Sequence, residues 1–154
     1  MKNFMKIGVA VMAAILFSGL AIAQKGTNEP AGVARQEIKP PIIPLSGKLL
    51  KIMTGACERS TGRSPMGTHL ILQSKDDKTI NIHLGPIGAV AHIVDQLAPG
   101  QFLTINAFRT DQLPDNEFIA KSLELDKKII HLRDNNLRPS WAYGRSKTRW
   151  GSCW

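Results

Sequence analysis

Cysteine and aromatic residues are scarce in this chain of 154 residues. It has two Cys, and Phe, Trp and Tyr together make up 6% of it. Two cysteines exclude a dense disulfide scaffold and a zinc site built of four thiolates. So few aromatic rings leave little material for a surface that stacks many nucleic-acid bases. The sequence also lacks the GxSxG, P-loop, Rossmann and CxxCH motifs, and we therefore expect that the protein is not an enzyme.

Acidic residues are outnumbered, because 20 Lys and Arg stand against 12 Asp and Glu, a formal net charge of +8. Part of this excess lies in the first segment. Lys2 and Lys6 precede an uncharged apolar run over residues 7–23, which ends in an Ala-Ile-Ala string. This arrangement predicts a cleaved secretory signal peptide over residues 1–23, with an uncleaved membrane anchor as the alternative. Cleavage would lower the net charge to +6, leave no stable transmembrane segment, and place the protein in the periplasm or outside the cell.

The remaining residues fall into three segments. Residues 24–45 are rich in Pro and Gly, which predicts a flexible leader without regular hydrogen bonding. Residues 46–141 are predicted to form the folded domain, and residues 142–154 a basic tail that contains aromatic residues. Within the domain, period-2 alternation and turn residues predict strands and one helix. The strands are expected at 47–53, 68–73, 79–84, 101–108, 117–125 and 129–133, a long loop at 54–66, and the helix at 87–97.

Three strands, a helix and then two or three more strands is the order of an OB-fold, a small closed Greek-key barrel. We therefore predict a mainly β, OB-like barrel of five to six strands, with one short helix between strands three and four. Closure suits this chain because it leaves no sheet edge exposed. An open β-sandwich in which residues 87–97 are not helical is the alternative.

A series of short motifs occurs along the predicted domain. They are Gly67-Thr68-His69-Leu70, Ile82-His83-Leu84-Gly85-Pro86, Pro99-Gly100, and Leu132-Arg133-Asp134 followed by Pro139 and Trp141. In this order they resemble a family of small exported bacterial OB-like domains, similar to the domain of the magnetosome-associated proteins MamS and MamX. The resemblance covers about residues 46–141, and it implies the fold and export more than an activity.

His69 and His83 are the candidate metal ligands. They lie on neighbouring predicted strands, so that their imidazoles could share a copper or iron ion. The sequence shows no evident third ligand, and His83 shares its strand face with Asn81, a face expected to be solvated. Two structural histidines beside a hairpin, with no cofactor, are therefore the alternative.

The two cysteines, Cys57 and Cys153, are separated by most of the domain. In an exported protein two thiols most often pair, so a disulfide between them is one expectation. A pair of reduced thiols or an intermolecular bridge are the alternatives.

Basic residues gather in the predicted loop and in the tail. Together with an aromatic side chain they predict a binding surface for an envelope protein or an anionic envelope polymer. The alternative is a solubilising tail whose Trp141 packs on the barrel. Export and the scarcity of aromatic residues argue against nucleic acid as the partner. The residues of this predicted surface are Arg59, Arg63, Arg145, Lys147, Arg149 and Trp150.

Three functions are open at this point. The first is an exported, non-enzymatic OB-like module that contacts a partner protein, an anionic envelope component or a small ligand. The second is a metal-handling accessory that uses His69 and His83, for iron or copper in envelope redox chemistry or biomineralisation. The third is a hydrolase with a site that no motif reveals.

Overall fold

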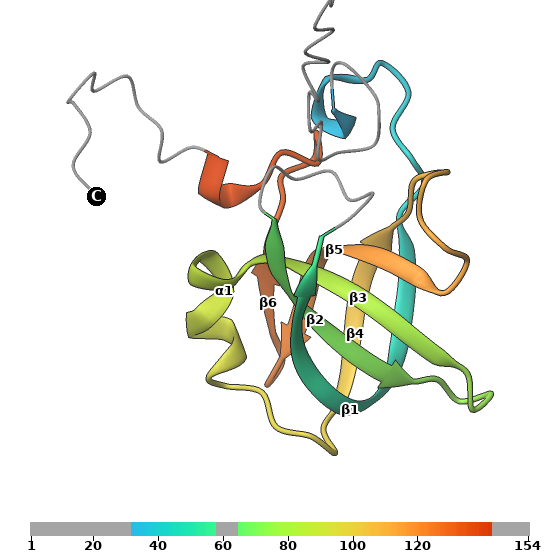
Figure 1. Cartoon of the computed structure of the whole chain (residues 1–154), viewed down its shortest axis with the longest axis vertical. Coiled ribbons are helices and arrows are strands. Elements are labelled where there is room, and N and C mark those ends of the chain that lie inside the picture. The colour runs from blue at the N-terminus through green and yellow to red at the C-terminus, as the bar shows by residue number, and fades with distance from the viewer. Residues whose placement is uncertain (1–31, 58–64, 143–154) are drawn as a thin grey trace, which may run out of the picture.

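The computed structural model describes residues 32–57 and 65–142, and six β-strands make up most of this part of the chain (Figure 1). One helix, α1 (Ile87–Val94), lies between the third and fourth strands. In the described ranges, no helix has the length and apolar character that crossing a membrane requires. The strands are β1 (Ile43–Ala56), β2 (Met66–Gln73), β3 (Thr79–Pro86), β4 (Phe102–Phe108), β5 (Glu117–Leu125) and β6 (Lys128–His131), and the 3-10 helices are η1 (Val33–Arg35) and η2 (Ser140–Ala142).

The strands bond to one another in a closed ring. The first half of β1 pairs antiparallel with β4, and its second half pairs antiparallel with β2. The β2–β3, β4–β5 and β5–β6 pairs are also antiparallel, and a short parallel pairing of β3 with β5 closes the ring. This is the mainly β, OB-like barrel with one short helix between strands three and four, as the sequence predicts.

The bounds of several elements differ from those predicted, most of all those of β1, α1 and β6. β1 extends from Ile43 to Ala56, beyond the expected 47–53, so that residues 54–56 belong to a strand and not to the loop. It is longer because each half finds a partner strand and completes its ladder hydrogen bonds. The helix α1 ends at Val94 and not at residue 97, although Leu97 still packs in the core.

The last strand also ends earlier than predicted, at His131 and not at residue 133. The backbone N–H groups of Leu132 and Arg133 both donate to the carbonyl of Lys121. Two residues thus oppose one at this point, which is the local irregularity of a bulge. Arg133 lies in this bulge, and its side chain is buried.

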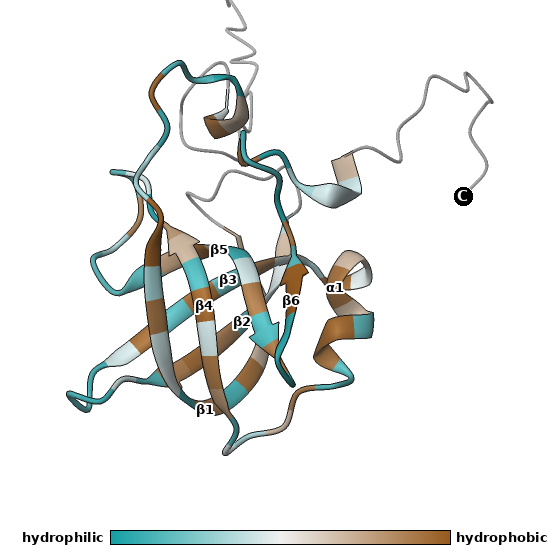
Figure 2. Cartoon of the chain, turned by 180° about the vertical axis from the view of Figure 1, so that it is seen from behind, coloured by the Kyte–Doolittle hydropathy of each residue, from teal (hydrophilic) through white to brown (hydrophobic). Residues whose placement is uncertain are grey.

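The barrel interior is filled by alternate residues of the strands, and the apolar positions are visible along them in Figure 2. Ile82 and Leu84, which the alternation places on one face, are fully buried, and Ile80 is partly buried. Val90 and Ile93 of α1 join the same core, so the helix covers the barrel against β2 and β3.

A second, smaller apolar cluster lies apart from this core. Three of its members lie outside the strands, in the segment before β1, the loop after β4 and the segment after β6. They pack against the end of β4 and against β5, at one end of the barrel (Figure 1). Its members are Val33, Phe108, Leu113, Ile119 and Leu137.

Candidate metal centre

Cys57, His69 and His83 converge at the end of the barrel where β1 finishes and β2 begins. Cys57 directly follows β1, while His69 and His83 are register partners on β2 and β3. The Cys57 Sγ and one ring nitrogen of each histidine all lie within 4.8 Å of one another. The two imidazole rings are 4.2 Å apart between centroids, and all three residues are buried, with exposures of 7%, 5% and 5%.

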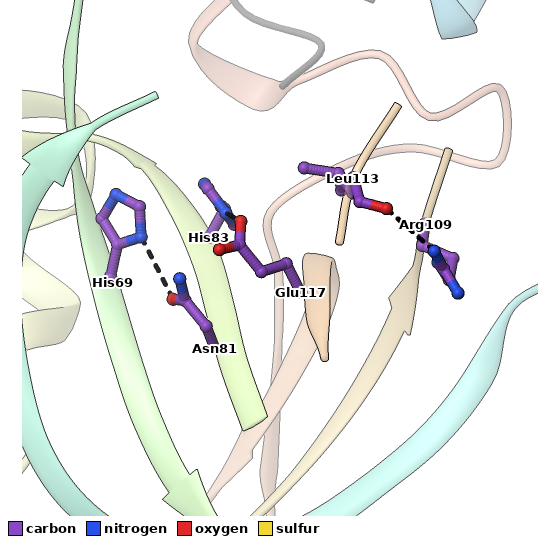
Figure 3. Close-up of polar contacts among 6 residues, drawn as sticks. All are labelled: His69, Asn81, His83, Arg109, Leu113 and Glu117. Atoms are coloured by element: carbon purple, nitrogen blue, oxygen red, sulfur yellow. Dashed lines mark hydrogen bonds and ion pairs between the residues drawn. The ribbon is translucent and has the colours of Figure 1, made fainter. Parts of the chain in front are cut away.

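Each histidine ring is hydrogen-bonded to one other side chain. Asn81 Oδ1 accepts a hydrogen bond from His69 Nδ1 at 3.1 Å, and Glu117 Oε2 accepts one from His83 Nε2 at 2.9 Å (Figure 3). These bonds place the ring protons on the bonded nitrogens, which leaves lone pairs on His69 Nε2 and His83 Nδ1.

Those two remaining nitrogens are buried and have no hydrogen-bond partner. A buried polar atom without a partner is costly, and such atoms are rare in native proteins. In Figure 3 both point away from Asn81 and Glu117. A metal-bound histidine characteristically donates its other ring N–H to a carboxylate, a carbonyl or water. Here the carboxylate of Glu117 and the amide oxygen of Asn81 accept these bonds.

Two glycines leave room for these donor atoms. A Cβ at Gly67 would overlap Cys57 Sγ, and a Cβ at Gly55 would lie 3.3 Å from His69 Nε2. Gly55 and Gly67 are register partners on β1 and β2, so the absence of both side chains opens the same part of the sheet surface. Glycine is required at residue 67 because of this close approach and not because of its backbone angles.

Arg133 is the buried cation beside this cluster. Its Nη1 donates to the carbonyl of Leu84, the residue after His83, at 3.3 Å, and also to the carbonyl of Ala120. The guanidinium lies over the rings of Trp141 and Phe108, at 5.1 and 5.9 Å from their centroids.

The charges of this cluster act on one another. Burial lowers the pKa of Arg133 to about 9, and the attraction of Cys57 opposes this shift, so that Arg133 is still protonated at neutral pH. This attraction requires the thiolate form of Cys57, which is also the form that binds metals. Burial is also the largest cause of a lowered pKa at His83, and His69 and Arg133 lower it further. The hydrogen bond and the charge of Glu117 oppose that shift, but the net direction keeps His83 neutral, the form that binds metals.

The structure brings together some of the predicted site residues and corrects one expectation. His69 and His83 lie next to each other. The face that His83 shares with Asn81 is less solvated than expected, since His83 is buried and Asn81 half-buried, because the start of β5 pairs alongside β3 and brings Glu117 to it. The predicted surface residues Arg59, Arg63, Arg145, Lys147, Arg149 and Trp150, and the predicted disulfide partner Cys153, all lie outside the described residues. Trp141 packs against the main core, with its ring against Gly85.

Sequence reasoning missed Cys57 as a third candidate donor, and missed that Glu117, Asn81 and Arg133 surround the cluster. The available signal for Cys57 was its position just after the first strand. An antiparallel partner strand begins at that end, and His69 lies near the start of it.

The comparison with known protein families identifies the family of the chain. The MamS/MamX magnetosome protein family matches residues 43–130. The chain belongs to this family. The resemblance drawn from the short motifs is thus confirmed, and Cys57, His69 and His83 all lie inside the matched range of the MamS/MamX family.

Other comparisons add little to the family assignment. One similar solved structure is that of a mitochondrial single-stranded DNA binding protein, Rim1, from S. cerevisiae. It has 10% sequence identity and a TM-score of 0.42, and the match covers 61% of this chain and 98% of that one. No curated protein sequence matches the chain significantly.

Proposed function

We propose that this member of the MamS/MamX family is a non-enzymatic accessory protein that binds one transition-metal ion through Cys57, His69 and His83. Family membership suggests a magnetosome-associated accessory role. The predicted signal peptide supports action in the periplasm or outside the cell, where iron or copper would be the metal handled.

A single observation carries this proposal. Two buried imidazole nitrogens, His69 Nε2 and His83 Nδ1, have no hydrogen-bond partner, and their residues belong to the same donor group as Cys57. Structural histidines beside a hairpin would be expected to have both nitrogens bonded or one exposed to water. A metal ion would satisfy both nitrogens and the thiolate at once.

The donor set fits a transition metal and not calcium or magnesium. Thiolate and imidazole are ligands for copper, zinc and iron, whereas Ca²⁺ and Mg²⁺ require mainly oxygen ligands. The hydrogen bonds from Asn81 and Glu117 orient the two rings before a metal arrives. This preorganisation lowers the free-energy cost of binding.

The first test is metal uptake by the purified, reduced protein. We expect one Cu, Zn, Fe or Co ion per chain by elemental analysis, and a sulfur-to-metal charge-transfer absorption with Co(II). Both signals should be lost in Cys57→Ser and in the His69→Ala/His83→Ala double variant, because each removes donors that the centre needs.

His131→Ala is a matched control, since His131 is an exposed histidine on β6. It should bind the metal as the wild type does. Cys153→Ser should also keep full uptake, because Cys153 supplies none of the three proposed donors. Absence of stoichiometric uptake by the reduced wild type would contradict the proposed function.

A further inference from the structure

We propose that the Cys57–His69–His83 centre selects monovalent copper, Cu(I), over divalent cations, and that the buried Arg133 sets this selectivity. The inference rests on the proposed function and deepens it, since it names the ion and a residue that does not itself bind it.

The number and type of donors support Cu(I). Among the described residues, the cluster contains three donors, one thiolate and two imidazoles, and no further His, Cys, Asp or Glu joins it. The nearby Glu117 oxygen is engaged by His83. Zinc bound by three protein ligands takes a water or substrate as its fourth ligand, and here all three donor residues are buried. Hard divalent ions need mainly oxygen ligands, whereas soft thiolate donors favour Cu(I).

The fixed charges point the same way. Arg133 carries one positive charge and Glu117 one negative charge, so these two balance formally. Metals bind histidine in its neutral form and cysteine as the thiolate, so the three donors bring a single negative charge to the centre. One monovalent cation neutralises it, while a divalent cation leaves a net positive charge among buried groups.

The difference in net charge between the two ions affects binding strongly because Arg133 is buried. Arg133 has 6% exposure and its guanidinium is anchored on the carbonyl beside His83 and against the Trp141 ring. It cannot swing into water to relieve repulsion without giving up these contacts. Because charges interact strongly where water is excluded, the repulsion between Arg133 and a bound ion is about twice as large for a divalent as for a monovalent ion.

The test is the ratio of Cu(I) to Zn(II) affinity in wild type and in charge variants of the full protein. Cu(I) is measured under anaerobic conditions with ascorbate by competition with bicinchoninate, and Zn(II) by competition with a fluorescent chelator. In Arg133→Met we expect the ratio to move toward Zn(II) by about tenfold or more. Arg133→Lys keeps the charge and should stay near the wild-type ratio.

Two further variants complete the design. Glu117→Gln keeps an acceptor for His83 but removes a negative charge, so the ratio should move toward Cu(I). Lys128→Met removes an exposed charge on β6 and should leave the ratio unchanged. If Arg133→Met does not fold, the shift in Glu117→Gln decides the matter.

The outcomes separate this inference from the proposed function. The metal could bind through Cys57 with the same ratio of Cu(I) to Zn(II) affinity in wild type, Arg133→Met and Glu117→Gln. That result would overturn only the role given to Arg133. A wild type that prefers Zn(II) to Cu(I) would overturn the selectivity. A wild type that binds neither ion would overturn the proposed function as well.

Discussion

At the scale of single residues, the site depends on what is missing as much as on the donors. Gly67 lies against Cys57 Sγ, and any side chain at residue 67 would occupy the position of the sulfur. The Cys57 thiol therefore reaches the histidines only because residue 67 has no Cβ. Gly85 has a similar role, because a Cβ at this residue would lie 2.5 Å from the Trp141 ring.

Substitution Gly67→Ala should displace Cys57 from the two histidines. We expect a loss of about tenfold or more in metal affinity, and a destabilisation of about 1–3 kcal/mol from overpacking. Metal titration and denaturant unfolding of the same variant measure the two effects.

The matched control is Gly88→Ala. A Cβ at residue 88 of α1 would meet nothing within 4 Å, so this variant should keep its metal affinity. It should also gain up to about 1 kcal/mol, because alanine is the better helix former. Equal metal affinities in the two alanine variants would contradict the role given to Gly67.

At the scale of elements, the closure of the ring assembles the surroundings of the histidines. The parallel β3–β5 pairing sets Glu117 opposite Asn81, and His83 lies two residues further along β3. Both acceptors that orient the imidazoles therefore lie next to each other on neighbouring strands. Neither the β2–β3 hairpin nor β5 could supply this arrangement alone.

Substitution Asn81→Ala should weaken metal binding by about 10- to 100-fold, because His69 loses the acceptor that fixes its tautomer and its ring orientation. Asn81→Asp keeps an acceptor and should recover most of the affinity. Asn106→Ala is the control, since Asn106 Nδ2 donates to Ser122 Oγ across the β4–β5 pair. Titrations of the three variants with the same metal are compared. If Asn81→Ala binds as tightly as Asn106→Ala, His69 is not oriented by residue 81.

At the scale of the whole molecule, the metal would join three strands that are not all neighbours. The donors come from the end of β1, from β2 and from β3, and Arg133 reaches them from beyond β6. An ion bound only by the folded barrel shifts the unfolding equilibrium by mass action.

Thermal unfolding should therefore depend on the metal. At a free concentration of about 100 times Kd, the folded state should gain about 2.7 kcal/mol, which calorimetry detects as a higher Tm. The His69→Ala/His83→Ala double variant should show no such gain. An equal gain in this variant would mean that the metal binds elsewhere.

Much of the fold is predictable because it depends on local patterns. The alternation of Ile80, Ile82 and Leu84 predicts which face of that strand enters the core, and residues 117–125 form a strand with the bounds expected. Residues 129–133 were predicted less well, since the bulge at Leu132 and Arg133 depends on Lys121 of another strand.

The candidate site is less predictable for the same physical reason. The pairing of His69 with His83 follows from a hairpin, which is local in sequence. The Cys57 donor, the Glu117 acceptor and the buried charge of Arg133 lie far apart along the chain, and no spacing rule connects them.

Periodicity and short motifs suffice to predict the order of the strands along the chain, the place of the helix, the apolar core and the family of the chain. Spacing does not show that Cys57 joins the two histidines as a third candidate donor, that His83 is buried, or that Arg133 is the cation beside them. Closure of the barrel brings these groups together and excludes water from them. That exclusion makes two unpartnered nitrogens and one buried charge a candidate centre for a metal ion.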